Sequence, residues 1–166
     1  MPCTAATGVT DAFGLVLSTT EEAAAAYQQG VRHLLAERPE ALLSFARAAR
    51  ADRSFALAPA GLALAGSIAG RAAQYRAVDR ARAAARLGNR RERQHVEIVA
   101  AAITGPPQLA LALTIKHLDE FPEDVVVLMA ARRAVTRTAD RRLCIRLRKL
   151  VDQLFANWSA VGAAER

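Results

Sequence analysis

Apolar residues recur at three- and four-residue steps along most of this chain, which is the period of an α-helix with one buried face. The clearest stripe lies near the C-terminus, with arginines between its members: Leu143, Leu147, Leu150, Leu154 and Trp158. Segment 55–69 is instead apolar nearly all round. A helix of that kind belongs at the buried centre of a helical protein.

Turn-forming residues interrupt the helical pattern about every seventeen residues. They are Pro39, Asp52, Gly70, Gly88, the Gly105-Pro106-Pro107 run, Pro122 and Thr138. The stretches between them predict about eight helices, over residues 20–37, 39–51, 55–69, 71–87, 90–104, 107–120, 125–134 and 138–159. Two intervals span about 34 residues, the length of one tetratricopeptide-type (TPR) helix-turn-helix unit.

We therefore expect an all-α fold, a right-handed stack of four antiparallel hairpins that forms a TPR-like α-solenoid. A single domain would cover residues 19–160, ending in an amphipathic, basic capping helix over 138–159. Residues 1–18 are expected to form an N-terminal tail that docks through Phe13, Leu15 and Leu17. Small residues in the first hairpin, such as Gly30 and Ala48, would let its two helices approach closely.

Several helix ends carry capping signals. Thr19 followed by Glu22 predicts a capping box at the first helix, and Asn89 predicts a cap for the fifth. Pro39 and Pro107 are expected in the first turns of the second and sixth helices, where the missing N–H costs nothing.

Composition supports helical packing and places the chain in a reducing compartment. Hydrophobic residues make up 52% of the chain but aromatic residues only 5%, which argues against a β-sandwich. Cys3 and Cys144 give neither a disulfide framework nor a metal-binding set. The N-terminus has no secretory pattern and no window is long and apolar enough to span a membrane, so we expect a cytoplasmic protein without membrane contact.

Positive charge is gathered in two blocks. The net charge is +7, while segment 71–93 sums to +6 and segment 132–149 to +7, so the remaining residues sum to −6. The excess of arginine over lysine fits drift in a GC-rich coding sequence, but the clustering favours an acidic partner.

Five stretches stand out within about residues 11–135: Asp11 to Thr20, Glu22-Ala23, Asp52 to Ala58, Arg91 to His95 and His117 to Pro122. In their residues and their order they resemble the bacterial and animal family related to tetratricopeptide repeat protein 38. Members of that family are typically longer, and this chain departs from them where the basic block and the Trp158 helix begin. The resemblance implies an α-helical repeat fold and no established activity, so no catalytic residue is carried over.

The histidines each have a carboxylate one helical turn away, but only Glu92 and His95 have the Glu-x-x-His order of a carboxylate-bridged metal bundle. We therefore expect no metal site and no cofactor. No nucleophile pattern or phosphate-binding glycine loop is present, so we assign no catalytic residue.

Two surfaces are candidates for partner binding. The start of the fifth helix carries Arg91, Glu92, Arg93 and His95, which with Tyr27 would line a concave face and hold an anion. On the last helix, one basic face and one apolar stripe stand out: Arg142, Arg146 and Lys149 for the acidic partner, and Leu147, Leu154 and Trp158 for contact with a second copy.

The sequence thus favours an interaction or scaffold module that binds an acidic peptide segment or a small anion, with a homodimer through the last helix as a further option. One alternative is a small helical enzyme or cofactor-binding protein that uses Glu92 and His95 as an acid–base pair. Another is binding of nucleic acid through segment 132–149, against which the lack of interleaved aromatic residues argues.

Overall fold

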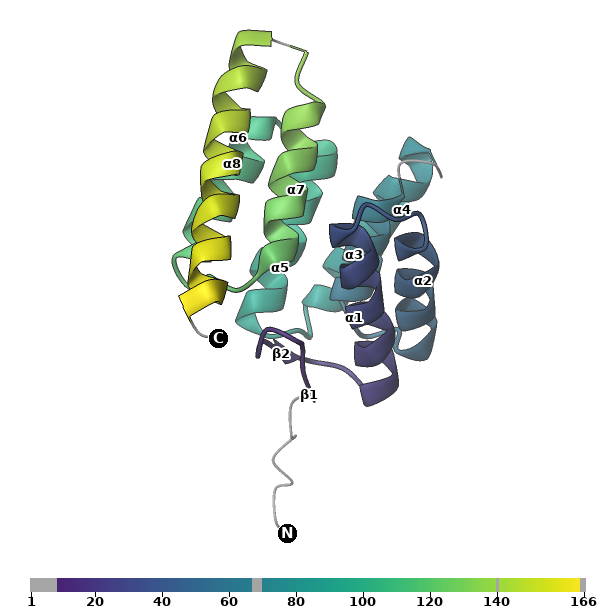
Figure 1. Cartoon of the computed structure of the whole chain (residues 1–166). Helices are drawn as coiled ribbons and strands as arrows, with labels where there is room; N and C mark the ends of the chain where they lie inside the picture. Colours follow the sequence, from purple (N-terminus) through teal and green to yellow (C-terminus); the bar gives the residue numbers. More distant parts are fainter. Residues whose placement is uncertain (1–8, 67–69, 140, 165–166) are drawn as a thin grey trace.

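Eight helices and one short hairpin of strands make up the part of the chain that the computed structural model describes, residues 9–66, 70–139 and 141–164, with side chains as far as residue 157. Two strands come first, β1 (Val9–Thr10) and β2 (Val16–Leu17). The helices follow as α1 (Glu21–Leu35), α2 (Ala41–Ala51), α3 (Leu57–Ala65), α4 (Arg71–Ala85), α5 (Arg90–Thr104), α6 (Pro107–Leu118), α7 (Val125–Thr136) and α8 (Arg141–Ala164). The expectation of an all-α protein with about eight helices is confirmed for these residues (Figure 1).

Consecutive helices pack against each other in the pairs α1–α2, α3–α4, α5–α6 and α7–α8. The odd-numbered helices also contact one another, from α1 to α3, α3 to α5 and α5 to α7. These contacts place α1, α3, α5 and α7 in an inner layer, with the even-numbered helices outside it. In Figure 1 the first four helices form one side of the molecule and the last four the other.

The core is built from small side chains around a few large ones. Phe45 and Phe55 are completely buried, and Tyr27 lies between them in tilted and edge-on contacts with ring centroids 5.6 Å and 5.2 Å away. Most other core residues are alanine, valine or leucine. Such residues allow the close helix approach expected from the composition.

Local chemistry sets most helix ends, with two shifts from the expected positions. Thr20, not Thr19, caps α1 by accepting the amide of Ala23, while the Thr19 hydroxyl donates to Asp52 at 2.7 Å. The second helix begins at Ala41, two residues beyond Pro39. Asn89 caps α5 as predicted.

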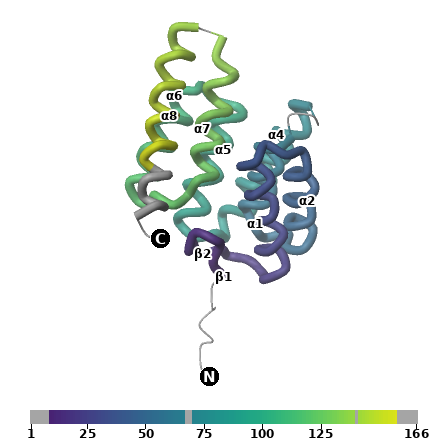
Figure 2. Tube along the Cα trace, viewed as in Figure 1, coloured from purple at the N-terminus to yellow at the C-terminus, as the bar shows by residue number. Residues whose placement is uncertain are grey.

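The segment expected to be a tail forms the β1–β2 hairpin, which lies at the lower end of the molecule in Figure 2. Val9 pairs with Leu17 and Thr10 with Val16 in antiparallel register. At its turn, Oδ1 of Asp11 accepts the amides of Phe13 and Leu15, both at 2.9 Å, and Gly14 takes the φ of +79° that favours glycine.

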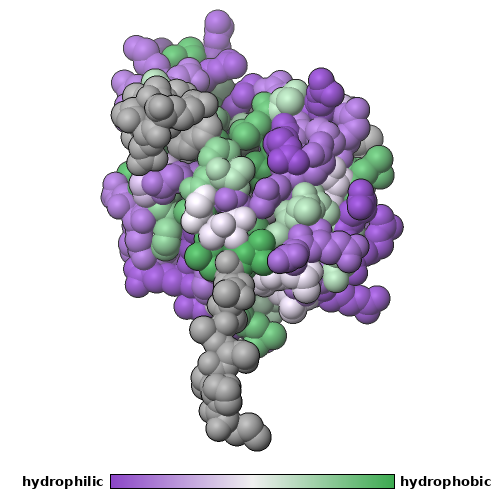
Figure 3. All heavy atoms as spheres, turned by 60° about the horizontal axis from the view of Figure 1, so that its bottom comes forward, coloured by the Kyte–Doolittle hydropathy of each residue, from purple (hydrophilic) through white to green (hydrophobic). Residues whose placement is uncertain are grey.

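The hairpin docks mainly through Leu17, which is 1% exposed. Phe13 and Val16 are exposed by 37% and 52%, and on the end of the molecule seen in Figure 3 hydrophobic residues lie among hydrophilic ones.

The C-terminal helix α8 packs on α6 and α7 through a small second core. Its fully buried member is Val151, next to Leu111, Ala131 and Val135, with Leu147 and Leu154 half-buried around it. The side chain of Trp158 lies outside the described residues. None of the described helices is long and apolar enough to cross a membrane.

Candidate functional site

A single buried carboxylate, that of Asp124, joins three cationic or imidazole side chains at the start of α7. Its Oδ2 accepts hydrogen bonds from Nη1 of Arg91 at 2.9 Å, Nδ1 of His95 at 3.0 Å and Nε2 of His117 at 3.2 Å. All four residues are at most 5% exposed. We call this group the Asp124 cluster.

The pKa of Asp124 reflects a competition between burial and these partners. Burial alone would raise the pKa, but His95, His117 and Arg91 outweigh it and hold the pKa of Asp124 well below its usual range. Asp124 is therefore ionised, and each nitrogen that faces it must donate a hydrogen.

His117 connects the Asp124 cluster to the surface. Its Nδ1 lies 2.8 Å from Oε1 of Gln94, and the amide nitrogen of Gln94 donates to Glu120 at 3.2 Å. Since Gln94 uses its donor on Glu120, its oxygen must accept from Nδ1, and Nε2 of His117 already donates to Asp124. His117 thus bridges Asp124 and Gln94, and through Gln94 the Asp124 cluster reaches Glu120.

Not every polar atom of the Asp124 cluster has a partner. Nε and Nη2 of Arg91 and Nε2 of His95 are buried without a hydrogen bond to the described residues. Such atoms cost free energy, so the arrangement is held by the packing of α5, α6 and α7 around it.

The structure separates the residues that the sequence grouped at the start of α5. Arg91 and His95 belong to the Asp124 cluster, whereas Glu92 turns the other way, completes the capping box with Asn89 and accepts the amide of Ser18 at 2.8 Å. His95 is thus paired with Asp124 instead of Glu92. Arg93 is exposed and donates to the carbonyl of Gly88 at 2.6 Å.

Tyr27 is also buried, at 2% exposure, and does not share a surface with Arg93. The predicted binding roles of Tyr27, Arg91, Glu92, Arg93 and His95 remain predictions. Of the residues at the start of α5, Arg91, Glu92 and His95 are buried and do not face solvent.

A separate feature, which we call the basic groove, runs over α7 between the end of α1 and α8. It consists of two adjoining hollows of about 420 and 410 Å³ that share Arg132 and Thr136. Its charged lining comprises four arginines and two acids: Arg38, Arg132, Arg133, Arg148, Glu37 and Asp152. Arg132 pairs with Glu37 at 2.5 Å, and the pair is about half exposed on both sides.

Arg133 is the least compensated charge in the basic groove. Its Nε is buried without a hydrogen-bond partner among the described residues. Burial lowers the pKa of Arg133, and the neighbouring Arg137 lowers it further. A guanidinium that is partly desolvated and next to a second one favours an approaching anion.

The residues predicted on α8 lie apart from this groove lining. Arg142, Arg146 and Lys149 are exposed, while Leu147 and Leu154 pack within the chain against the second core. Residues of α8 that do line the groove include Arg148 and Asp152. No cluster of His, Cys, Asp and Glu in the part of the chain that is described could hold a metal ion.

Sequence reasoning missed Asp124 as a site residue and treated it only as a helix-start acid. One signal was available: Asp11, Arg91, His95 and His117 all lie in the stretches that carry the family resemblance. These stretches, far apart in sequence, meet around Asp124.

The described part of the chain is thus a mainly helical protein with two candidate sites, the buried Asp124 cluster and the basic groove on its surface. No protein-family model, curated protein or solved structure matches it.

Proposed function

We propose that this protein is a TPR-like interaction module that binds an acidic segment of a partner protein in the basic groove. The layered contacts of the odd-numbered helices support a solenoid-like stack. The same contacts fit membership of the family related to tetratricopeptide repeat protein 38, which we propose on the stretches quoted above.

The observation that carries the proposal is Arg133, a partly buried guanidinium with one nitrogen that has no hydrogen-bond partner among the described residues. A carboxylate in the groove would pair with the accessible part of the Arg133 guanidinium and would balance the surplus of arginines in the lining. Apolar stretches of the lining, such as Leu34, Leu64 and Met129, would take the aliphatic parts of the same peptide.

The basic groove serves this function better than the start of α5 does. Arg91 is already neutralised by Asp124, whereas the groove arginines outnumber the acids beside them. The partner is therefore expected to bear carboxylates spaced along an extended or helical segment that follows α7.

Fluorescence anisotropy with a labelled glutamate-rich peptide tests this function. We expect Arg133→Ala and Arg148→Ala each to weaken binding about tenfold, because a charge-assisted hydrogen bond is lost at each position. Arg76→Ala, on the exposed face of α4, is the matched control and should bind as the wild type does.

Binding should also weaken as salt is raised, and a peptide with glutamine in place of glutamate should not bind. Equal affinity of the wild type and Arg133→Ala, with both folded by circular dichroism, would contradict the proposal. Tighter binding of a single-stranded oligonucleotide than of the peptide would contradict it as well.

A further inference from the structure

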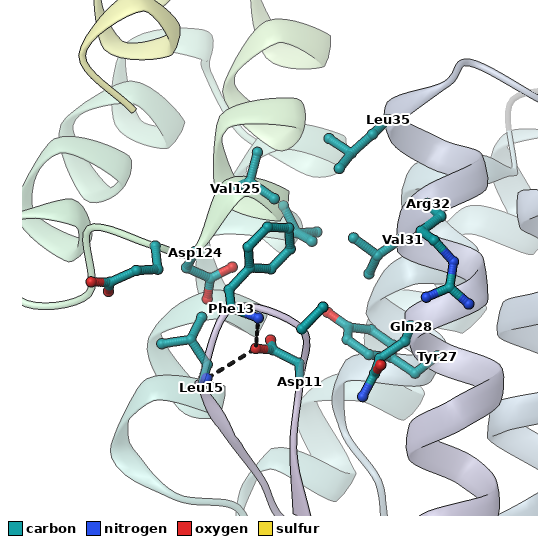
Figure 4. Close-up of a pocket in the computed structure, with 13 residues that line it drawn as sticks. Asp11, Phe13, Leu15, Tyr27, Gln28, Val31, Arg32, Leu35, Asp124 and Val125 are labelled. Carbon is teal, nitrogen blue, oxygen red and sulfur yellow. Dashed lines mark hydrogen bonds between the residues drawn. The ribbon is translucent and has the colours of Figure 1, made fainter. Parts of the chain in front are cut away.

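Another hollow lies at the other end of the seam between α1 and α7, and its charged lining is mainly acidic where that of the basic groove is mainly basic. It encloses about 40 Å³ between α1, the start of α7 and the turn of the β1–β2 hairpin (Figure 4). Phe13, Val31 and Val125 form part of its apolar lining, and Asp11, Tyr27 and Asp124 bring polar groups to it. We call it the Tyr27 cavity.

The hydroxyl of Tyr27 makes no hydrogen bond to a described residue, although the residue is only 2% exposed. Figure 4 shows the ring entering from α1 with its oxygen directed at the turn that carries Asp11. The hydroxyl lines the cavity, and a tyrosine hydroxyl in such a setting normally finds a hydrogen-bond partner. A ligand in the cavity would supply the hydrogen-bond partner that the hydroxyl lacks.

Two carboxylate oxygens at the cavity have unused acceptor capacity. Asp11 uses Oδ1 for the amides of Phe13 and Leu15, and Asp124 uses Oδ2 for the Asp124 cluster. The other oxygen of each, Oδ2 of Asp11 and Oδ1 of Asp124, accepts no hydrogen bond from the described part of the chain. With the Tyr27 hydroxyl they make three acceptors.

The charge around the cavity favours a cation. Its lining includes the acids Asp11, Glu123 and Asp124 against one base, Arg32, whose guanidinium donates to Gln29. Burial raises the pKa of Asp11, and burial together with Asp124 raises that of Tyr27, while Arg91 partly offsets both effects. Even with Arg91 counted, the three acids outnumber the two bases around the cavity.

We propose that the Tyr27 cavity binds a small primary alkylammonium ion. The ammonium group has three N–H donors, which match Oδ2 of Asp11, Oδ1 of Asp124 and the hydroxyl of Tyr27. Its short alkyl chain lies against Val31, Val125 and Phe13. This site is independent of the proposed peptide function, since it uses none of the groove arginines.

The volume selects the size of the ligand. A cavity of about 40 Å³ holds about three water molecules, which is the space of an ammonium group with one or two carbons. A larger amine would have to displace Phe13 at the edge of the hairpin turn. The proposal therefore commits to a free small amine and not to the lysine side chain of a partner protein.

A nuclear magnetic resonance titration with ethylammonium chloride tests the site. The amides of Phe13 and Leu15 report directly on it, because both donate to Asp11. We expect saturable shifts of these signals in the millimolar range, the affinity expected of a ligand with so few atoms. Ethanol, a neutral molecule of the same size, should give no saturable shift.

Variants distinguish this site from general attraction of cations. Tyr27→Phe keeps the ring and should weaken ethylammonium binding at least threefold, and Asp11→Asn at least tenfold. Tyr75→Phe and Asp79→Asn, both on the exposed part of α4, are the matched controls and should leave it unchanged.

Three outcomes would overturn the proposal. One is the absence of saturable shifts, which would mean that the cavity holds water only. Another is equal binding by wild type and Tyr27→Phe. The third is binding of Nα-acetyl-lysine methylamide without binding of ethylammonium, which would assign the site to a partner's lysine.

Discussion

At Asp124, one carboxylate oxygen is shared by three donors from two other helices. Arg91 and His95 reach it from α5 and His117 from α6, so a single side chain at the start of α7 connects three helices. An ionised group in the interior is tolerated only when its partners offset the lost hydration. The Asp124 cluster therefore acts as a cross-link whose strength depends on that one charge.

Replacing Asp124 by asparagine tests the cross-link. We expect Asp124→Asn to lower the free energy of unfolding by about 3–5 kcal/mol, because Arg91 would keep a buried charge without its counterion. Urea denaturation followed by circular dichroism measures the change. Asp79→Asn, on the exposed face of α4, is the control and should change stability by less than about 0.5 kcal/mol.

The pH dependence of that loss has a defined sign. The pKa of Asp124 is lower in the folded than in the unfolded protein, so its stabilisation is fully present above the unfolded value and is lost as pH falls toward the folded value. The stability gap between wild type and Asp124→Asn should therefore narrow below about pH 4. A gap that widens in acid would contradict the assignment.

At the scale of the helices, packing in the first half depends on two glycines that face one aromatic ring. A Cβ at Gly30 of α1 would lie 2.6 Å from the ring of Phe45, and one at Gly61 of α3 would lie 2.5 Å from it. Phe45 also contacts the ring of Tyr27 and is completely buried. The aromatic ring of Phe45, which belongs to α2, is thus confined between α1 and α3.

We expect Gly30→Ala to destabilise the protein by about 1–3 kcal/mol, the usual cost of overpacking a core. Alanine is the better helix former by about 1 kcal/mol, so a loss of stability would show that packing outweighs helix propensity here. Thermal unfolding of Gly30→Ala, Phe45→Leu and the double variant measures the coupling. The double variant should be more stable than the sum of the two single changes implies, and strict additivity would argue against the contact.

Across the whole molecule, contacts run mainly between helices that are near in sequence. The last helix packs on α7 and reaches Leu111 of α6. Opposite charges lie at the two ends of the α1–α7 seam, with acids at the Tyr27 cavity and arginines at the basic groove. A disturbance at one end of such an array should spread only to its neighbours.

Val151→Asp tests this independence. It places a charge in the second core, where Val151 is 2% exposed, and should destabilise α8 by about 3 kcal/mol or more. Hydrogen exchange should then rise in α6, α7 and α8 while α1 to α3 keep their protection. Gln153→Asp adds the same charge at an exposed position of α8 and is the control. Loss of protection throughout the chain would show that the molecule unfolds as one unit.

Helix positions could be predicted well because their causes lie within a few residues. Asn89 and Pro107 mark the starts of α5 and α6, Asn89 through its capping side chain and Pro107 through its fixed backbone angle, and no distant contact is needed for that. Thr19 shows the limit of this reasoning, since it has the chemistry of a cap but its hydroxyl donates to Asp52, 33 residues away, and Thr20 caps α1 instead.

The sequence by itself determined a helical chain, the approximate ends of its helices and the two blocks of positive charge. Only the tertiary structure decided that Arg91 and His95 turn inward to Asp124, 33 and 29 residues further on. It also leaves one nitrogen of Arg133 without a hydrogen-bond partner in the described part of the chain, beside the basic groove. Helix propensity and capping depend on neighbours along the chain. The partner of a charge depends on which helix faces lie together, and that is fixed by the packing of small residues across the whole inner layer.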